Sequence, residues 1–130
     1  MFENLEIFRM ANGLARHSAT RQEVIARNVA NADTPKYRAK DVQSFVEAFD
    51  HAQTSRQTFK ATRAGHITPH EVGLNWIAEI DTPEEASPNG NTVSLEAEMM
   101  KSSETRHQHE LALSVYRSSM TILRMSIGRS

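Results

Sequence analysis

Cysteine is absent from the 130-residue chain. Disulfides, thiolate nucleophiles and thiolate-bound metal ions are therefore excluded. Positive charge is not concentrated either, since lysine and arginine are scattered along the chain and the formal net charge is −1. Nucleic-acid-binding proteins gather their basic residues on one face. We therefore expect no nucleic-acid partner.

Long apolar runs are also missing. The most apolar window, from Leu111 to Met125, is too short for a membrane span and contains Arg117 and Arg124. We therefore do not expect an integral membrane protein. The first ten residues include Glu3 and Glu6 and have no basic region followed by an apolar core, so we do not expect a cleaved signal peptide. If the chain works outside the cytoplasm, it is expected to leave by a route that needs no such signal.

The motifs of common enzymes are not found. His66 and His70 are four residues apart, but Glu71 follows the pair instead of lying within it, as the zinc-protease pattern requires. His107 and His109 point to different faces of a helix. The sequence has no glycine-rich phosphate loop and no nucleophile elbow. We expect no catalytic, cofactor-binding or metal-binding residues. A metal-dependent enzyme built on His66, His70 and Glu71 is the least favoured alternative.

What the sequence does contain is a long stretch without glycine or proline, residues 94–127. It predicts one helix that Ser94 caps and Gly128 ends. Such a helix would be roughly 50 Å long, whereas a compact chain of this length is about 35 Å across. We expect a long coiled coil or a multi-subunit assembly to cover it; the alternative is a kinked helix in an ordinary bundle. Steps of four and three define its packing seam: Leu95, Met99, Ser102, Arg106, His109, Leu113, Tyr116, Met120, Leu123 and Ile127.

The first thirty residues repeat this pattern and predict a second amphipathic helix. The helix is either continuous or begins near Leu14, because Gly13 costs about 1 kcal/mol inside a helix. Both seams are polar in the middle. Those polar residues either meet partners that fix the register between helices or turn to solvent, and the sequence leaves both interpretations open. The N-terminal seam comprises Ile7, Ala11, Leu14, Ser18, Arg21, Ile25 and Asn28.

Residues 31–37 follow this helix and carry strong turn signals. Pro35 restricts Thr34 to extended geometry, and Asn31 and Asp33 favour turns through hydrogen bonds to nearby backbone. The pattern predicts a structured elbow with Tyr37 as its apolar anchor. On local grounds alone, an ordinary loop that ends a helix is the alternative.

The stretch from Ala26 to Tyr37 resembles the N-terminal signature of bacterial flagellar axial proteins, the rod and hook family. Residues 21–25, 38–41 and 90–99 also resemble that family, its proximal rod members in particular, and the resemblance covers residues 1–50 and 88–130. One position departs from the pattern. Lys36 stands where the family usually has glycine, which adopts backbone angles that lysine reaches only at a cost.

The resemblance implies a structural role: a subunit that assembles helically into the hollow drive shaft of the flagellar basal body and transmits torque. It implies no cofactor and a place in the periplasmic rod. The implied partners are further copies of the chain, rod proteins of the FlgC, FlgF and FlgG types, a FliE-type adaptor, the MS ring and the flagellar type III export apparatus. The expected assembly motif comprises Asn28, Asn31, Asp33, Thr34, Pro35 and Tyr37. Residues expected to pack between helices or subunits are Ile7, Leu14, Ile25, Leu95, Met99, Leu113, Tyr116, Met120, Leu123 and Ile127.

We expect a mainly α fold, in which residues 1–37 and 94–130 form one discontinuous, coiled-coil-like inner-tube domain around a small irregular middle segment, residues 38–93. Within that segment, the apolar spacing from Val42 to Phe49 predicts a short helix capped by Asp41. The polar run 50–57 indicates a loop. Residues 72–80 alternate like a strand, and residues 81–90 indicate a linker rich in turn formers.

A cytoplasmic helical adaptor or secretion chaperone is the main alternative function. It would require the terminal helices to be formed in dilute solution. In a rod subunit, by contrast, seams that are polar in the middle favour helices that order fully only within the assembly.

Overall fold

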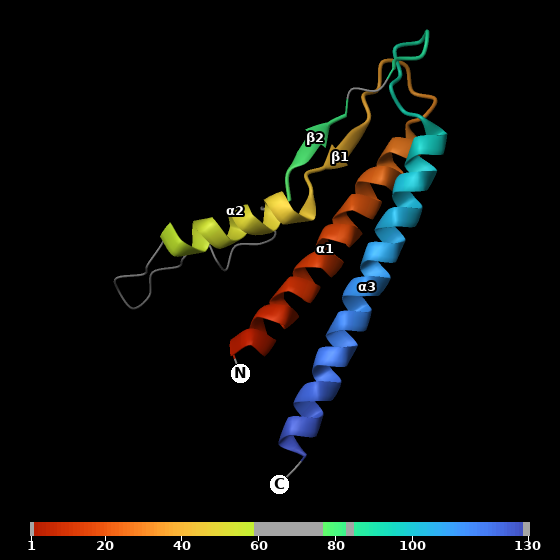
Figure 1. Ribbon diagram of the computed structural model, residues 1–130. Helices are drawn as coiled ribbons and strands as arrows, with labels where there is room; N and C mark the ends of the chain where they lie inside the picture. The colour runs from red at the N-terminus through yellow and green to blue at the C-terminus, as the bar shows by residue number, and fades with distance from the viewer. Residues whose placement is uncertain (1, 59–76, 83–84, 129–130) are drawn as a thin grey trace.

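The computed structural model describes residues 2–58, 77–82 and 85–128 (Figure 1). Two long helices, α1 (Phe2–Ala30) and α3 (Leu95–Ile127), lie side by side and run antiparallel. Between them in sequence come β1 (Lys40–Val42), α2 (Phe45–Thr58) and β2 (Glu79–Asp81). The predicted fold class is confirmed: the chain is mainly α, with long terminal helices and a small middle segment.

The helix pair has two distinct ends. We call the end at Ala30 and Leu95 the elbow end, and the end at Phe2 and Ile127 the open end. Contacts along the pair keep one register, because each step back along α1 is matched by an equal step forward along α3. The contacts that define this register are Asn28 with Glu98, Gln22 with Ser102, and Phe8 with Tyr116.

α3 begins and ends as its sequence indicates. The Ser94 hydroxyl accepts a hydrogen bond from the backbone N–H of Ala97, and the N–H of Gly128 donates to the Arg124 carbonyl. α1 continues through Gly13 without a break, so the continuous alternative is correct. No helix in the described part of the chain is both long and apolar enough to span a membrane.

Apart from Ile25, small and polar side chains form the buried rows between the two helices. On α1 the buried row is Ala11, Ser18 and Ile25, and on α3 it is Glu98, Thr105 and Ala112, each spaced by seven residues. The buried hydroxyl groups bond within their own helices: Ser18 donates to the Leu14 carbonyl and Thr105 to the Lys101 carbonyl. Small side chains and internally satisfied hydroxyl groups allow the helix backbones to approach closely.

The buried row of α3 lies one position before Met99, Arg106 and Leu113 of the predicted seam, so these three residues lie to one side of the contact with α1. Leu95 is 53% exposed and Met99 66% exposed. Tyr116 is half-exposed and packs edge-to-face on Phe8, with ring centroids 5.3 Å apart. These large apolar side chains are therefore left without full cover by their own chain.

A short antiparallel hairpin covers one side of α1. β1 pairs with β2, with Lys40 opposite Asp81 and Val42 opposite Glu79. Backbone hydrogen bonds from Gln43 to Ala78 and from Thr82 to Ala39 extend the pairing at both ends. The predicted strand at residues 72–80 is only partly tested, because residues 72–76 lie outside the described residues; within the rest, the strand begins at Glu79.

The middle helix differs from its prediction at both ends. Asp41 and Val42 lie in β1, not at the start of a helix; Ser44 caps α2 instead, accepting hydrogen bonds from Glu47 and Ala48. The predicted loop at residues 50–57 is wrong, since α2 continues to Thr58. That stretch is polar but contains no glycine or proline, so nothing in its backbone chemistry stops the helix.

Aromatic rings connect α2 to α1. A Cβ atom added at Gly13 would lie 3.5 Å from the Phe45 ring and 3.7 Å from the Phe49 ring. His17, which is 3% exposed, packs edge-to-face on Phe45 and donates from Nε2 to the Gln43 carbonyl at 2.8 Å. The start of α2 is therefore held against α1, while its far end projects away from the helix pair (Figure 1).

Candidate functional site

Asn28, in the last turns of α1, connects three elements at the elbow end. Its side chain is fully buried. The amide nitrogen donates to the Lys40 carbonyl at 2.6 Å and to Glu98 Oε2 at 3.1 Å. Its oxygen accepts from the Lys40 N–H at 3.2 Å and from the Tyr37 hydroxyl at 3.3 Å. One side chain thus ties α1 to β1, to α3 and to the elbow.

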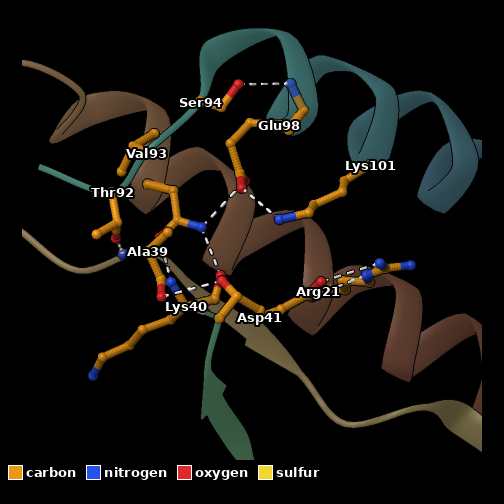
Figure 2. A network of polar contacts seen from close by, with 12 residues as sticks. Arg21, Ala39, Lys40, Asp41, Thr92, Val93, Ser94, Glu98 and Lys101 are labelled. Atoms are coloured by element: carbon orange, nitrogen blue, oxygen red, sulfur yellow. Dashed lines mark hydrogen bonds and ion pairs between the residues drawn. The ribbon is translucent and has the colours of Figure 1, made fainter. Parts of the chain in front are cut away.

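Glu98, on the first turn of α3, brings a negative charge into this site. It is 0% exposed. One carboxylate oxygen accepts from Asn28, and the other accepts from Lys101 Nζ at 2.9 Å (Figure 2). A buried carboxylate is tolerated only where hydrogen bonds and an opposite charge replace water. Glu98 has both.

Arg21 and Asp41 form a second ionic contact beside the first. Arg21 Nε and one terminal nitrogen donate to the two Asp41 oxygens at 3.0 and 3.1 Å, and the other terminal nitrogen reaches Glu104 at 3.4 Å. Burial alone would raise the pKa of Asp41, but the hydrogen bonds from Arg21 and from the Val42 N–H, with the nearby charges, lower that pKa below its ordinary value. This paired geometry is stronger than a single-point ion pair.

Asn91 fastens the elbow to the start of α3. It is 2% exposed, and its amide nitrogen donates to the carbonyls of Asn31, Ala32 and Thr34 at 2.8–2.9 Å. Its oxygen accepts from the Val93 N–H at 2.7 Å. One side chain from a segment about 60 residues later therefore bonds three carbonyls of the elbow, just after α1 ends.

Thr92 and Asn89 add backbone pairing to the same corner. The Thr92 hydroxyl accepts from the Ala39 N–H at 2.8 Å, and its N–H donates to the Tyr37 carbonyl. The N–H of Lys36 donates to the Asn89 carbonyl at 3.1 Å. The two loops at the elbow end therefore form one hydrogen-bonded unit.

The structure brings several residues of the expected assembly motif together. Asn28 and Tyr37 bond each other, and Asn31 donates to the Arg27 carbonyl while it accepts from the Thr34 hydroxyl. Asp33, Thr34 and Pro35 are exposed on the outside of the elbow. Whether these residues act in assembly stays a prediction.

The expected packing residues differ in how exposed they are to solvent. Ile25 is buried within the chain, and Leu14, Met120 and Leu123 are partly exposed. The others are exposed: Ile7, Leu95, Met99, Leu113, Tyr116 and Ile127. Their role between subunits also stays a prediction.

Sequence reasoning missed Glu98, Asn91 and Asp41 as members of this site. Glu98 could have been found from its spacing. Glu98, Thr105 and Ala112 are seven residues apart and so lie on one face of the helix, and that face has no large apolar residue. Asn91 sits in a turn-forming Asn-Gly-Asn sequence, which gave no indication of where its side chain would bond.

The site offers hydrogen bonds and ion pairs but no arrangement for catalysis. Among the described residues, no group of three or more histidine, aspartate and glutamate side chains could hold a metal ion. His66, His70 and Glu71 lie outside the described residues.

Comparison with known proteins identifies the family. A family model described as "Flagella basal body rod protein" matches residues 11–38, which span most of α1 and the elbow with Asn28 and Tyr37. The chain is 34% identical over 129 residues to the flagellar basal body rod protein FlgB of Agrobacterium fabrum, covering 96% of this chain and 95% of the relative. The chain belongs to the FlgB family of flagellar basal body rod proteins.

Other FlgB proteins support the same assignment. FlgB of Escherichia coli is 34% identical over 103 residues, with 74% of each chain covered, and FlgB of Salmonella typhimurium is 29% identical over 103 residues, with 75% covered. The family is structural, and the chain is not an enzyme.

The backbone at Lys36 adopts the conformation that glycine favours, as the resemblance implied for this position. Its φ is +62°, in the left-handed region, and the neighbouring Gly90 has φ +82°. A side chain in this region costs roughly 1 kcal/mol relative to glycine. Lys36→Gly is therefore expected to raise the free energy of unfolding by about 1 kcal/mol, measured by urea denaturation. Lys36→Ala, which keeps the Cβ atom, should give no such gain; an equal gain from both variants would contradict the explanation.

The buried amide of Asn28 gives a sharper prediction. Asn28→Asp replaces its N–H donors with an acceptor that faces the Glu98 carboxylate and the Lys40 carbonyl. We expect the free energy of unfolding to fall by about 3 kcal/mol. Asn12→Asp, on the exposed side of the same helix, is the matched control and should cost less than about 1 kcal/mol. Similar losses in both variants would show that Asn28 has no special role.

The lowered pKa of Asp41 predicts acid sensitivity. Because the folded pKa lies below the unfolded value of about 3.9, the stabilisation is complete above that value and is lost as the pH falls through the folded pKa. Unfolding midpoints measured between pH 7 and pH 2 should therefore decline below about pH 4. Asp41→Asn should be less stable at pH 6 and show a shallower decline; an unchanged acid profile would refute this assignment.

Proposed function

We propose that this chain is a subunit of the proximal part of the flagellar rod, where it assembles helically with further copies and with other rod proteins into a hollow shaft that transmits torque. The observation that carries this proposal is the uncovered apolar surface of α3. The helix has 33 residues and is roughly 50 Å long. α1 covers only one side of it (Figure 1).

The exposed side chains of α3 are large and apolar along much of the helix. Met99 is 66% exposed at the elbow end, and Met125 and Ile127 are 63% and 74% exposed at the open end. Extensive exposed apolar surface marks a site of association. Neighbouring subunits would cover it, and residues 1–37 and 94–130 would then act as one discontinuous domain.

Open association suits this shape. A contact between two different faces of a subunit, repeated without closing, builds a helical filament. In this proposal the partners are rod proteins of the FlgC, FlgF and FlgG types, a FliE-type adaptor and the MS ring. The chain would reach its periplasmic place through the flagellar export apparatus without a cleaved signal.

The adaptor alternative has less support. An adaptor that pairs its long helices in the cytoplasm would be expected to keep its apolar seam inside, whereas α3 buries Glu98, Thr105 and Ala112 and exposes most of its large apolar residues. Membership of the FlgB family also favours the rod.

Leu113→Asp tests the proposal. Leu113 is 38% exposed, so a charge there can reach solvent in the free subunit but would lose that access if the side chain were buried between subunits. In cells that carry only this variant, we expect normal export and at least about a tenfold loss of rods in basal-body preparations, as a buried charge predicts. Leu123→Asp should act in the same way.

Ser114→Asp is the matched control. Ser114 is adjacent, exposed, and lies in a row of polar residues on α3: Ser103, His107, Glu110, Arg117 and Thr121. The control should assemble normally. Rods of normal abundance with either leucine variant would contradict the proposed assembly.

A further inference from the structure

The sequence contains two asparagine–glycine pairs, and the fold places them in different surroundings. Asn12-Gly13 lies inside α1, whereas Asn89-Gly90 lies in a turn shortly before α3. An asparagine in this position can lose its side-chain amide, because the next backbone nitrogen attacks the side-chain carbonyl carbon and glycine has no side chain to hinder the attack. Since both pairs have the same chemistry, the fold decides which of them reacts.

The helices α1 and α2 protect the first pair. Gly13 is inside a 29-residue helix, so its N–H belongs to the helix's own hydrogen bonds. The rings of Phe45 and Phe49 lie over it, since a Cβ atom added at Gly13 would be 3.5 and 3.7 Å from them. Before the Gly13 nitrogen can attack Asn12, it must therefore leave both the helix and the cover of α2.

The second pair is restrained by a turn alone. Asn89 is exposed, and the backbone nitrogen of Gly90 donates to the Ser87 carbonyl at 2.7 Å. Surface turns open at a lower free-energy cost than the interior of a long helix. Gly90 has φ +82°, a conformation that favours glycine. The residue that the turn requires is thus also the one that leaves the attack unhindered.

The turn favours the reaction at the atom that is attacked. The N–H of Asn91 donates to Asn89 Oδ1 at 3.0 Å. This oxygen gains negative charge when a nitrogen adds to its carbon, and a donor already directed at it stabilises that charge. Asn89 therefore combines an accessible side chain with a polarised carbonyl group.

We propose that Asn89 is a site of spontaneous covalent modification, a deamidation with water as its co-reactant. The Gly90 nitrogen gives its proton to solvent and bonds to Asn89 Cγ. The bond from Cγ to the amide nitrogen breaks, and that nitrogen takes up a proton and leaves as ammonia. The product is a five-membered succinimide ring. The site needs only the folded chain and water, so it is independent of the proposed rod function.

Water then opens the succinimide ring in one of two ways, without oxidation or reduction. Addition at Cγ gives aspartate on the original backbone. Addition at the former backbone carbonyl carbon gives isoaspartate, in which the main chain runs through Cβ and Cγ and is longer by one carbon atom. The two products therefore have the same charge and differ in the path of the backbone.

Isoaspartate at position 89 disturbs the elbow end. The Asn89 carbonyl accepts the N–H of Lys36 at 3.1 Å, and in isoaspartate this carbonyl becomes part of a carboxylate outside the main chain. The longer backbone also moves Asn91, whose amide nitrogen bonds three carbonyls of the elbow. We expect the two loops of the elbow end to lose their hydrogen-bonded connection.

Peptide mapping by mass spectrometry tests the site on the unaltered chain, incubated in mildly alkaline buffer either folded or in denaturing guanidinium chloride. The denatured sample corrects for the influence of neighbouring residues. The rate of conversion of Asn89 relative to Asn12 should be at least about tenfold higher in the folded chain than in the denatured one, because a turn opens more easily than a helix. An equal ratio in both samples, or an Asn89 that stays intact in the folded chain, would overturn the inference.

Two variants separate the covalent change from its effect on stability. Asn89→Ser retains an oxygen for the Asn91 N–H but cannot form the ring, so its thermal unfolding midpoint should not fall on incubation. Asn89→Asp, measured before incubation, has the charge of the products on the original backbone and should melt within about 3 °C of the fresh unaltered chain.

Chains enriched in isoaspartate should melt at least about 5 °C below the fresh unaltered chain, because the elbow connection is lost. A midpoint as high as that of Asn89→Asp would overturn the effect assigned to the longer backbone.

Discussion

The buried carboxylate of Glu98 is the constraint on which the rest of the structure depends. A charge without solvent access must keep its partners, and here these are the Asn28 amide and the Lys101 ammonium group. Apart from Ile25, the buried rows of α1 and α3 otherwise hold small or hydroxyl-bearing residues such as Ala11 and Ala112, whose packing constrains the relative position of the helices only weakly. The polar contact therefore fixes the register that the apolar packing leaves loose.

The same contact passes its geometry on to the middle segment. Asn28 bonds both backbone groups of Lys40, so the position of β1 is set by α1, and Arg21 holds the next residue of that strand, Asp41. Asn91 then fastens the end of α1 to the start of α3. The elbow end is thus cross-linked by directional hydrogen bonds, whereas at the open end the two helices meet through the aromatic contact of Phe8 and Tyr116. In the proposed rod, such a rigid corner would let the subunit transmit torque, and the open end would provide surface that neighbours can cover.

How far the sequence could predict this depends on how local each feature is. The long helices, the Ser94 cap and the turn at residues 31–37 follow from short-range rules, and they are where the structure places them. The elbow network could not be predicted, because Asn28, Glu98 and Asn91 are about 60 to 70 residues apart in sequence and only the fold brings them together. Asp41 has the side chain of a helix cap, but its ion pair with Arg21 holds it in a strand. Residues 50–57 were predicted to form a loop because they are polar, but they contain no helix breaker and continue α2.

A chain that folded alone would be expected to place large apolar residues inside and polar ones outside. This helix pair reverses part of that order, with Glu98 and Thr105 buried and Met99 and Leu95 exposed on the same helix. The buried polar residues and the exposed apolar residues have linked roles. Buried polar groups accept one register only, which gives every subunit the same shape. In the proposed rod, the exposed apolar groups would then meet each neighbour at the same level along the helix. A purely apolar inner surface would bind as tightly in several registers, and the outer faces of successive subunits would no longer match. The polar inner contact is therefore a requirement for the repeated outer one.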